Sequence, residues 1–303
     1  MNLHAATQTA APLLLKSDSS TPAFVVKGPN AISIRAGVTF STYVYAEETP
    51  ISLPDGGLEI GGDYGIVIDI TGAPSAQRMI GGESPQPSYV GGFHYAPGGN
   101  AVARAGGDTT PVINSFSVWD RNFRPACPDP RGMALVDAPS GRFWCDIYLL
   151  SCNHRLTGRT SEFGATIADG NDRPTGPDGK KVKAFDYPTA VNVLALYDKQ
   201  LLSLEEFFAA AYGVTEKTAC SGDPETTGLD APRTSKYGLM QATGNMWIWG
   251  HDGDPDEPRS SIFGGSWWND DSAGSRFARV GGWPGYSSES VGARGRSDHL
   301  QLG

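Results

Sequence analysis

The sequence lacks the long apolar run that a membrane-spanning helix requires, which is about 20 residues. Its first stretch, MNLHAATQTAAPLLLKSDSS, has no positively charged start, and the apolar segment APLLL within it is short. We therefore expect neither membrane insertion nor a signal peptide. Positive charge is also scarce, because 24 Lys and Arg face 33 Asp and Glu, for a net charge of -9. This balance argues against a nucleic-acid partner, since phosphate binding depends on a basic surface.

Cysteine is equally rare. The four cysteines, Cys127, Cys145, Cys152 and Cys220, form no CxxC pair or other zinc-like spacing. Without an export signal we expect most of them to be free and buried, while a Cys145–Cys152 link stays open. The five histidines show no HExxH motif and no close metal-pair spacing. The sequence therefore predicts no metal-dependent catalytic centre.

Glycine and proline are plentiful, with 39 and 22 residues, and β-branched runs lie between them. From about residue 20 to 120, the runs AFVVKG, AISIRAGVTFSTYVY and GGLEIGGDYGIVIDI are broken by Gly, Pro, Asn and Asp, a pattern typical of β-hairpins. The alternation in ISIRAGVTF predicts one half-buried strand with Ile32 and Ile34 on the same face. We predict a β-rich N-terminal domain over 1–125, for attachment or oligomerisation, and a second domain over 126–303.

The pattern changes after PACPDPRG. The stretch MALVDAPSGRFWCDIYLLS predicts a hairpin around its Pro-Ser-Gly turn. In TAVNVLALYD, the apolar residues Ala190, Val193, Leu194 and Tyr197 have helical spacing and predict an amphipathic helix.

A second helix is predicted in SLEEFFAAAYG. Ser203 and Glu206 have the spacing of a capping box, and Leu202 and Phe207 that of a hydrophobic staple. Gly213 is the expected stop. The residues predicted to face the core are Leu204, Phe207, Phe208 and Ala211.

The order of sequence blocks in the second half resembles a known fold. The blocks are GMALV, GRFWCDIYLLS, LLSLEEFFAAAYG, GLMQATGNMWIWG, FGGSW, GSR and GARGR. This series is similar to C-type lectin folds of the formylglycine-generating-enzyme type. The resemblance implies an α+β class in which residues 126–303 form a C-type lectin fold, with two helices, short strands and long loops.

A closer resemblance lies within that superfamily. The segment GGFHYAPGGNAVARAGGDTTPVINSFSVWDRNFRPACPDPRGM and the ending GARGRSDHL are similar to variable proteins of diversity-generating retroelements, particularly the phage tropism determinants. In such proteins, an error-prone copy of a template repeat replaces the 3′ end of the gene, so some C-terminal residues vary while others stay fixed. The resemblance places the variable region at about 264–300, with fixed blocks at 264–267, 274–276, Pro284 and 292–295. Related endings often carry Cys where this chain has Ser297.

The variable stretches have the composition of a binding surface. Tyr and Trp provide large contact areas with few torsions to freeze, while Ser, Gly and Asn provide adaptable hydrogen bonds. Trp247, Trp249 and Trp267 stand in fixed blocks with apolar neighbours and are predicted to be core. Other aromatics stand among Gly, Pro, Ser and Asp and are predicted to be exposed. The predicted anchors are Phe277, Arg279, Trp283 and Tyr286, and the rest of the predicted binding surface comprises Trp268, Asn269, Asp270, Asp271, Gly281, Gly282, Ser288, Glu289 and Ser290.

An enzyme is not expected. The enzymatic relatives of the fold oxidise a target cysteine with a reactive cysteine pair, yet the matching stretch SSESVGARGRS contains no cysteine, and thiolate chemistry needs a thiolate. Ser297, Asp298 and His299 are not expected to form a triad, because sequence neighbours rarely converge in that geometry. We predict no catalytic residues and place His299 at a strand end with a capping hydrogen bond.

Two segments hold a calcium alternative open. Trp268-Asn269-Asp270 spells the WND tripeptide of sugar-binding C-type lectins, but the partner tripeptide EPN or QPD is absent. In HDGDPDEP, acidic residues alternate as in calcium loops, yet Glu257 and Phe263 stand where an EF-hand has Gly and Glu. We predict no cofactor, with calcium as the alternative.

The sequence therefore predicts a non-enzymatic display protein whose diversified face binds a protein or glycan receptor on a target surface. The alternatives are a calcium-dependent carbohydrate-binding lectin and a degenerate modifying enzyme. The resemblance also implies a homo-oligomer, with a trimer as one form. A phage tail or a cell surface is the expected location, and the cytoplasm stays open.

Overall fold

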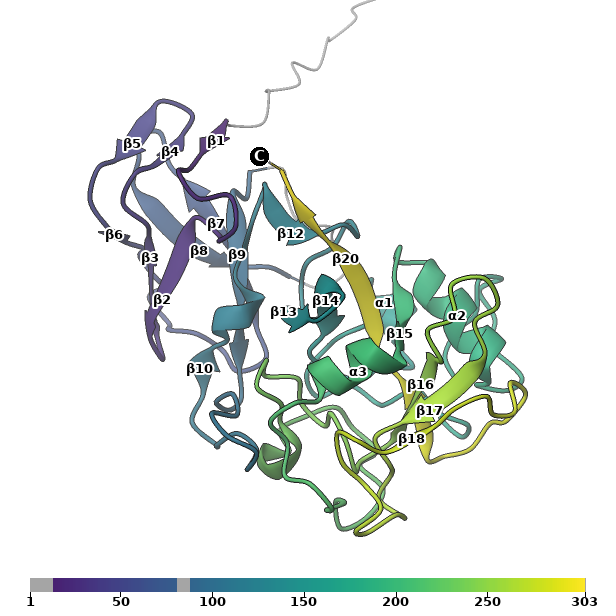
Figure 1. Cartoon of the computed structure of the whole chain (residues 1–303). Coiled ribbons are helices and arrows are strands. Elements are labelled where there is room, and N and C mark those ends of the chain that lie inside the picture. The colour runs from purple at the N-terminus through teal and green to yellow at the C-terminus, as the bar shows by residue number, and fades with distance from the viewer. Residues whose placement is uncertain (1–12, 81–87, 303) are drawn as a thin grey trace, which may run out of the picture.

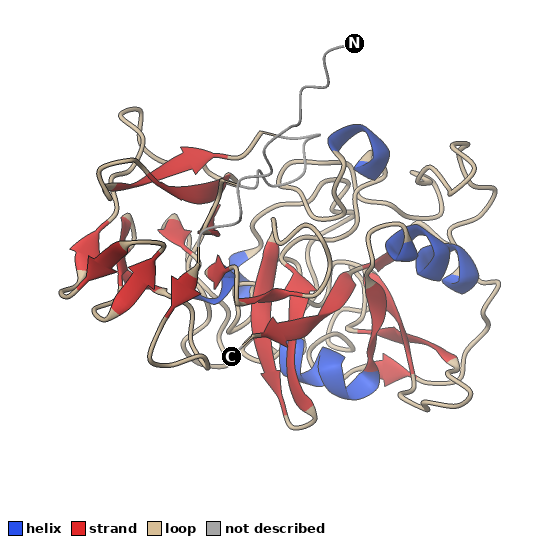
Figure 2. Ribbon diagram, turned by 90° about the horizontal axis from the view of Figure 1, so that it is seen from above, coloured by secondary structure: helices blue, strands red, loops and turns tan. Residues whose placement is uncertain are grey.

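The computed structural model describes residues 13–80 and 88–302. In this part of the chain, β-strands are numerous and short, and α-helices are few (Figure 1). Seen from above, the α-helices lie outside the strands (Figure 2). No helix among the described residues is long and apolar enough to cross a membrane. The architecture is mostly β with a few helices.

Two three-stranded sheets form the first part of the chain. One contains β1 (Leu14–Leu15), β4 (Val38–Phe40) and β5 (Tyr43–Tyr45), and the other contains β2 (Phe24–Gly28), β3 (Ala31–Ile34) and β6 (Thr49–Pro50). Their inward side chains share one buried core with the neighbouring strands of a larger sheet. Phe24 and Phe40 stack there with ring centroids 5.8 Å apart.

The segment ISIRAGVTF is not a single strand, so that prediction was wrong. β3 ends at Ile34 and β4 begins at Val38, because Gly37 between them has a φ of 81°, which glycine adopts without steric cost. The Gly37 N–H donates to the Tyr45 carbonyl at 2.7 Å and turns the chain into the β4–β5 hairpin. Ile32 and Ile34 do lie in the same core, as predicted.

A larger sheet of fourteen strands runs through the described residues. Its main path has the order β18-β17-β16-β15-β20-β12-β11-β9-β7-β8, and β10, β13, β14 and β19 branch from it. The bounds are β7 Asp63–Ile68, β8 Pro74–Arg78, β9 Gly91–Ala96, β10 Val112–Ile113, β11 Trp119–Asp120, β12 Phe123–Pro125, β13 Met133–Ala138, β14 Gly141–Asp146, β15 Gln200–Ser203, β16 Trp247–His251, β17 Ser260–Phe263, β18 Ala278–Arg279, β19 Val291–Ala293 and β20 Gly295–Gln301. The β13–β14 pair is the hairpin predicted from MALVDAPSGRFWCDIYLLS.

The C-terminal strand β20 joins the two halves of the chain. It pairs with β12 at one end and with β14 and β15 along the rest of its length. The C-terminus therefore returns to the beginning of the chain, where Gln301 Nε2 donates to Ser19 Oγ at 3.2 Å (Figure 1). The sheet is continuous across residue 125, and the proposed domain boundary at this position stays a prediction.

The helices are α1 (His154–Thr157), α2 (Tyr187–Ala195) and α3 (Leu204–Ala210), and two 3₁₀ turns occupy Ser115–Ser117 and Ala231–Arg233. The apolar stripe predicted for α2 is confirmed at its three helical positions, which are fully buried. The capping box of α3 is also present, with Ser203 Oγ accepting from the Glu206 N–H at 3.2 Å and Glu206 Oε2 accepting from the Ser203 N–H at 2.9 Å.

One residue of α3 was assigned to the wrong face. Phe208 is 40% exposed, whereas Phe207, Ala210 and Ala211 are buried. The helix is only seven residues long, and it packs on β13 and β15 through the face that carries Phe207. Phe208 follows by one position, about 100° around the helix, and points outward.

Candidate functional site

The predicted binding residues gather on loops at the β18 end of the large sheet. Trp268 lies between β17 and β18, and Trp283 and Tyr286 lie between β18 and β19. Their side chains are 65%, 80% and 41% exposed. These loops are the yellow-green segments at the lower right of Figure 1. The exposed aromatics predicted from the sequence therefore lie on the two loops that flank β18, the last strand on the path of the large sheet.

A cavity of about 290 Å³ lies between the β18–β19 loop and the sheet. Trp247 and Trp249 of β16 line it together with Ile262 of β17, and Trp283 and Tyr286 line it from the loop after β18. The other lining residues are Ser261, Arg279, Gly282 and Ser290. Loop residues and strand residues thus form one concave surface.

The tryptophans of β16 contribute to this surface although they were predicted as core only. Trp247 and Trp249 are 7% and 2% exposed, so the prediction of burial is confirmed. They are two positions apart in one strand and therefore share a face of the sheet. The alternation of apolar residues in NMWIWG predicts that Trp247 and Trp249 share one face of a strand. It does not predict that this face borders a cavity.

Arg279 lies at the cavity with its guanidinium over an aromatic ring. The Arg279 Cζ is 5.0 Å from the centroid of the Trp247 ring, a cation–π distance. The residue belongs to β18, which pairs with β17 through Arg279 and Ile262. The strand pairing holds the arginine at this place while its side chain stays exposed.

The loop that carries Trp268 is ordered by its own polar residues. Asn269 Oδ1 accepts from the Ser266 N–H at 2.9 Å and from the Ser266 hydroxyl at 2.8 Å. Trp268 stacks on Trp267 with ring centroids 4.1 Å apart, and Trp267 packs against the core. Asp270 and Asp271 are exposed, as predicted.

Other predicted surface residues are less exposed than expected. Ser290 is buried at 8% exposure, because it directly precedes β19 and its carbonyl accepts from the Trp247 N–H at 2.9 Å. Phe277, Ser288 and Glu289 are half-buried. Glu289 accepts a hydrogen bond from Asn171 Nδ2 at 2.9 Å, so a residue far away in sequence holds it. The exposed part of the predicted surface is therefore smaller than the full set of residues.

Beneath the loops, the segments 146–147, 240–241 and 292–295 form a frame that is connected by one buried arginine, Arg294. Arg294 is 1% exposed, and its Nη1 donates to the Asp146 and Ile147 carbonyls at 2.7 and 2.6 Å. Its Nη2 donates to the Met240 carbonyl at 2.6 Å and to the Gln241 carbonyl at 3.3 Å. One side chain thereby ties together three segments of the chain.

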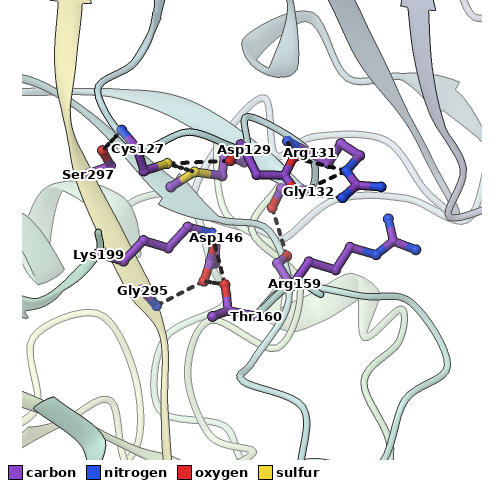
Figure 3. A network of polar contacts seen from close by, with 12 residues as sticks. Cys127, Asp129, Arg131, Gly132, Asp146, Arg159, Thr160, Lys199, Gly295 and Ser297 are labelled. Atoms are coloured by element: carbon purple, nitrogen blue, oxygen red, sulfur yellow. Dashed lines mark hydrogen bonds and ion pairs between the residues drawn. The ribbon is translucent and has the colours of Figure 1, made fainter. Parts of the chain in front are cut away.

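A buried ion pair completes this frame (Figure 3). The Lys199 ammonium lies 2.6 Å from Asp146 Oδ1, and Asp146 Oδ2 accepts from the Gly295 N–H at 3.1 Å and from the Thr160 hydroxyl at 2.7 Å. Every oxygen of the buried carboxylate is thus partnered, as buried charges require. The network holds the start of β20, which follows the β18–β19 loop and β19 in the chain.

The cysteines and the SDH triplet show structural environments. The four cysteines are free, and burial raises the pKa of Cys145 to about 12. Ser297 Oγ accepts from the Cys127 N–H at 2.9 Å, and His299 Nδ1 accepts from the Trp144 indole N–H at 3.0 Å. Asp298 pairs with Arg296, so each side chain of the triplet makes its own contact instead of forming a relay.

The two segments of the calcium alternative have internal partners. Hydrogen bonding to the Arg259 N–H lowers the pKa of Asp252, whose carboxylate also accepts from the Arg259 guanidinium at 3.0 Å. Asp254 Oδ1 accepts from the backbone of Asp256 and Glu257. Within residues 13–80 and 88–302, no group of three or more His, Cys, Asp or Glu side chains is arranged to hold a metal ion.

Solved structures share this architecture. The Major Tropism Determinant P3c variant matches with a TM-score of 0.86 at 37% identity, over 96% of this chain and 87% of that chain. The U1 variant matches with a TM-score of 0.85 at 35% identity, over 100% of this chain and 89% of that chain. A family model described as the Mtd second domain matches residues 22–120. Fold and site together define a mostly β protein of the tropism-determinant class.

Sequence comparison makes the assignment more specific. A tail fiber receptor-binding protein of Bordetella phage BPP-1 is 38% identical over 329 residues, which cover 95% of this chain and 85% of the relative. The chain belongs to the Major Tropism Determinant family. The descriptions of these relatives are those of receptor-binding and tropism proteins and not of enzymes, in agreement with the non-enzymatic class predicted from the sequence.

Proposed function

We propose that this chain is the receptor-binding protein of a phage tail and that it engages its receptor through the loops between β17 and β19. The observation that carries the proposal is the presence of Trp268, Trp283 and Tyr286 on the two loops that flank β18, each at least 41% exposed. Large exposed aromatics on a fixed frame are typical of binding hot spots. The receptor is a protein or a glycan on the surface of a target cell.

The same loops are suited to diversification by a retroelement. Their exposed side chains contact little of the core, whereas truncation of a core side chain commonly costs about 2 to 5 kcal/mol. The residues around Arg294 and Asp146 would hold the loop ends whichever side chains the loops display. The DNA next to the gene tests this origin. A reverse-transcriptase gene and a near-copy of the 3′ end that differs only at adenines would support it, and an isolated gene would contradict it.

We also assign the second half of the chain to the C-type lectin fold of the formylglycine-generating-enzyme type. The support is the order of α2, α3 and the β16–β17 hairpin, which follows the order of the sequence blocks. We further propose that this chain forms a trimer, as the family resemblance implies. Light scattering on the purified chain measures its mass directly, and a monomer at micromolar concentration would contradict the trimer.

We propose that binding needs no metal ion. The support is that the Asp252 and Asp254 carboxylates already accept hydrogen bonds within their own loop. Addition of EDTA is then expected to leave receptor binding and the melting temperature unchanged. A loss of both on chelation would favour a calcium-dependent lectin instead.

A cell-binding experiment tests the proposed function. Fluorescently labelled protein is incubated with a panel of bacterial strains, and cell-bound fluorescence is measured as a function of concentration. On a strain that binds it, the triple variant Trp268→Ala, Trp283→Ala and Tyr286→Ala is expected to lose at least about 100-fold in affinity, since each hot spot contributes about 2 kcal/mol or more.

The matched control is Ile70→Ser. Ile70 is 95% exposed and lies between β7 and β8, at the other end of the large sheet from β18. Removal of this exposed apolar side chain is expected to leave cell binding unchanged. Equal binding by the triple variant and the original protein would refute the proposed site.

A further inference from the structure

The cavity beside β18 has a specific chemical character that the proposed function does not by itself define. Its floor and walls are ring faces and an aliphatic side chain, from Trp247, Trp249 and Ile262 on the sheet and from Trp283 and Tyr286 on the rim. At about 290 Å³ it lies at the lower limit of small-molecule sites. It therefore has room for one ring-sized group and not for a chain of sugar rings.

Three polar groups of the cavity wall, on Ser261, Ser290 and Trp249, are already engaged within the chain. Ser261 Oγ donates to the Arg259 carbonyl at 3.2 Å and accepts from the Gly281 N–H at 3.4 Å. Ser290 Oγ pairs with Ser288 Oγ at 3.1 Å, and the Trp249 indole N–H donates to the Phe185 carbonyl at 3.3 Å. A sugar needs several free donors and acceptors for its hydroxyl groups, because each one left unpaired on burial costs free energy. These engaged groups do not supply them.

The backbone of the rim is fixed in the same way. The Gly282 N–H donates to the Ser260 carbonyl at 2.8 Å, and the Tyr187 N–H at the start of α2 donates to the Pro284 carbonyl at 3.0 Å. The turn that carries Trp283 and Tyr286 is closed by a hydrogen bond of 3.1 Å between them. The apolar rim is therefore held in place before a ligand arrives, which reduces the ordering cost of binding.

One charge at the cavity has no counter-charge. Arg279 lies over the Trp247 ring, and among the described residues no carboxylate lies within ion-pair distance of its guanidinium. Arginine in this position offers a planar set of donors that matches a carboxylate. The cavity thus combines an apolar interior with a single cationic group at its side.

We propose that this cavity receives one aromatic side chain of a protein receptor, and that a carboxylate next to that side chain pairs with Arg279. The proposal rests on the proposed receptor-binding function and names the chemistry that the site recognises. The occupant fits because it needs no hydrogen-bond partners inside the cavity and supplies the one charge that the wall lacks.

Small probes test the occupant on the full chain. N-acetyl-L-phenylalanine carries an aromatic ring beside a carboxylate, N-acetyl-L-phenylalaninamide lacks the charge, and methyl β-D-glucopyranoside represents a sugar. In ligand-observed NMR titrations, the acid is expected to bind with a dissociation constant of about 1 mM, as its number of atoms allows. The amide is expected to bind about two- to fivefold more weakly, which is the usual gain of an exposed ion pair. The glucoside is expected to show no saturable binding.

Three variants assign the effect to residues. Trp283→Ala is expected to weaken the binding of the acid by about tenfold, and Arg279→Gln is expected to make the acid and the amide bind equally. Ile70→Ser is the control, because Ile70 is an exposed apolar residue between β7 and β8 that does not line the cavity. It is expected to leave probe binding unchanged.

Tighter binding of the glucoside than of the acid, no saturable binding of the acid, or an unchanged preference for the acid in Arg279→Gln would each overturn the proposal. The cell-binding assay separates this failure from failure of the proposed function. If Trp283→Ala loses cell binding while the acid does not bind, the face is the receptor site but its occupant is a different group. If the triple variant keeps full cell binding, the receptor site itself lies elsewhere.

Discussion

Arg294 is the residue that most directly connects the segments beneath the loops flanking β18. Its guanidinium is fully buried, and burial lowers its pKa, yet it donates to four backbone carbonyls from two other segments of the chain. We predict that Arg294→Met lowers the free energy of unfolding by about 3 kcal/mol, because the carbonyls lose their donors in a site that water does not reach. Urea denaturation followed by circular dichroism measures this change.

The exposed Arg276 of the neighbouring fixed block provides the control. Arg276→Met is expected to change stability by less than about 0.5 kcal/mol, as for ordinary surface substitutions. If Arg294→Met were as mild as Arg276→Met, the buried guanidinium would not be what secures the frame.

A second prediction at this scale concerns pH. Burial lowers the pKa of His154 to about 4, against the opposing effect of its hydrogen bond to the Thr175 carbonyl. In the unfolded chain the imidazole has a pKa of about 6.5, so as the pH falls it takes up a proton before the folded chain does. The stabilising contribution of the neutral ring is therefore complete above pH 6.5 and is lost as the pH falls toward 4. We expect a loss of about 3 kcal/mol over this interval. In His154→Gln, the slope of stability against pH between 6.5 and 4 should be smaller, and an identical slope would contradict the assignment.

At the scale of elements, the loop between β17 and β18 is attached through a carboxylate outside the variable region. Glu216 Oε2 accepts from the Ser275 N–H at 3.1 Å, Glu216 Oε1 accepts from the Ser275 hydroxyl, and the Lys217 N–H donates to the Ala273 carbonyl at 2.8 Å. Gly274 has a φ of 147°, and a Cβ there would lie 2.2 Å from Glu216 Oε2. Residues 274–276 thus attach the loop to Glu216.

We therefore predict that Glu216→Ala loosens this loop without unfolding the protein. The Ser275 amide loses its acceptor, so its hydrogen exchange should become about tenfold faster, which corresponds to about 1.4 kcal/mol of local opening. Arg104→Gln is the control, because it removes the 3.3 Å contact of Arg104 with Glu216 and the contact of Arg104 with the Tyr212 ring but leaves the bonds of Glu216 to Ser275 in place. Surface ion pairs of this kind contribute little. Equal exchange at Ser275 in both variants would contradict the role of Glu216.

At the scale of the whole molecule, the two halves of the chain are joined by more than their connecting segment. β20 pairs with β12 on one side and with β14 and β15 on the other. The buried Asp63 of β7 also accepts from the Gly132 N–H at 2.9 Å and pairs with Arg159 at 2.8 Å. These contacts extend across the boundary predicted at residue 125.

We predict that the chain unfolds in one cooperative transition. In scanning calorimetry, the calorimetric enthalpy should equal the van't Hoff enthalpy, and tryptophan fluorescence and circular dichroism should report the same midpoint. Two separate transitions would show instead that residues 1–125 and 126–303 behave as independent domains. The outcome therefore tests the domain boundary as well.

Local features were predictable where neighbouring residues alone produce them. The capping box of Ser203 and Glu206 needs only the backbone of one helical turn, and the β13–β14 hairpin needs only a turn between two apolar runs. The strand containing Ile34 was predicted too long, since Gly37 permits the alternation to continue or the chain to turn. The outward position of Phe208 depended on which neighbours α3 has, and its own sequence does not contain them.

The amino-acid sequence by itself determined where helices are capped, where the chain turns at glycine and which loops carry exposed aromatics. These features depend on interactions within a few residues. Only the tertiary structure decided that Trp247 and Trp249 meet Arg279, Trp283 and Tyr286 around one cavity. It also decided that Ser290 is withdrawn from the surface and that Arg294 ties the frame together. These contacts join segments more than thirty residues apart, and their geometry follows from strand pairing and burial across the whole sheet.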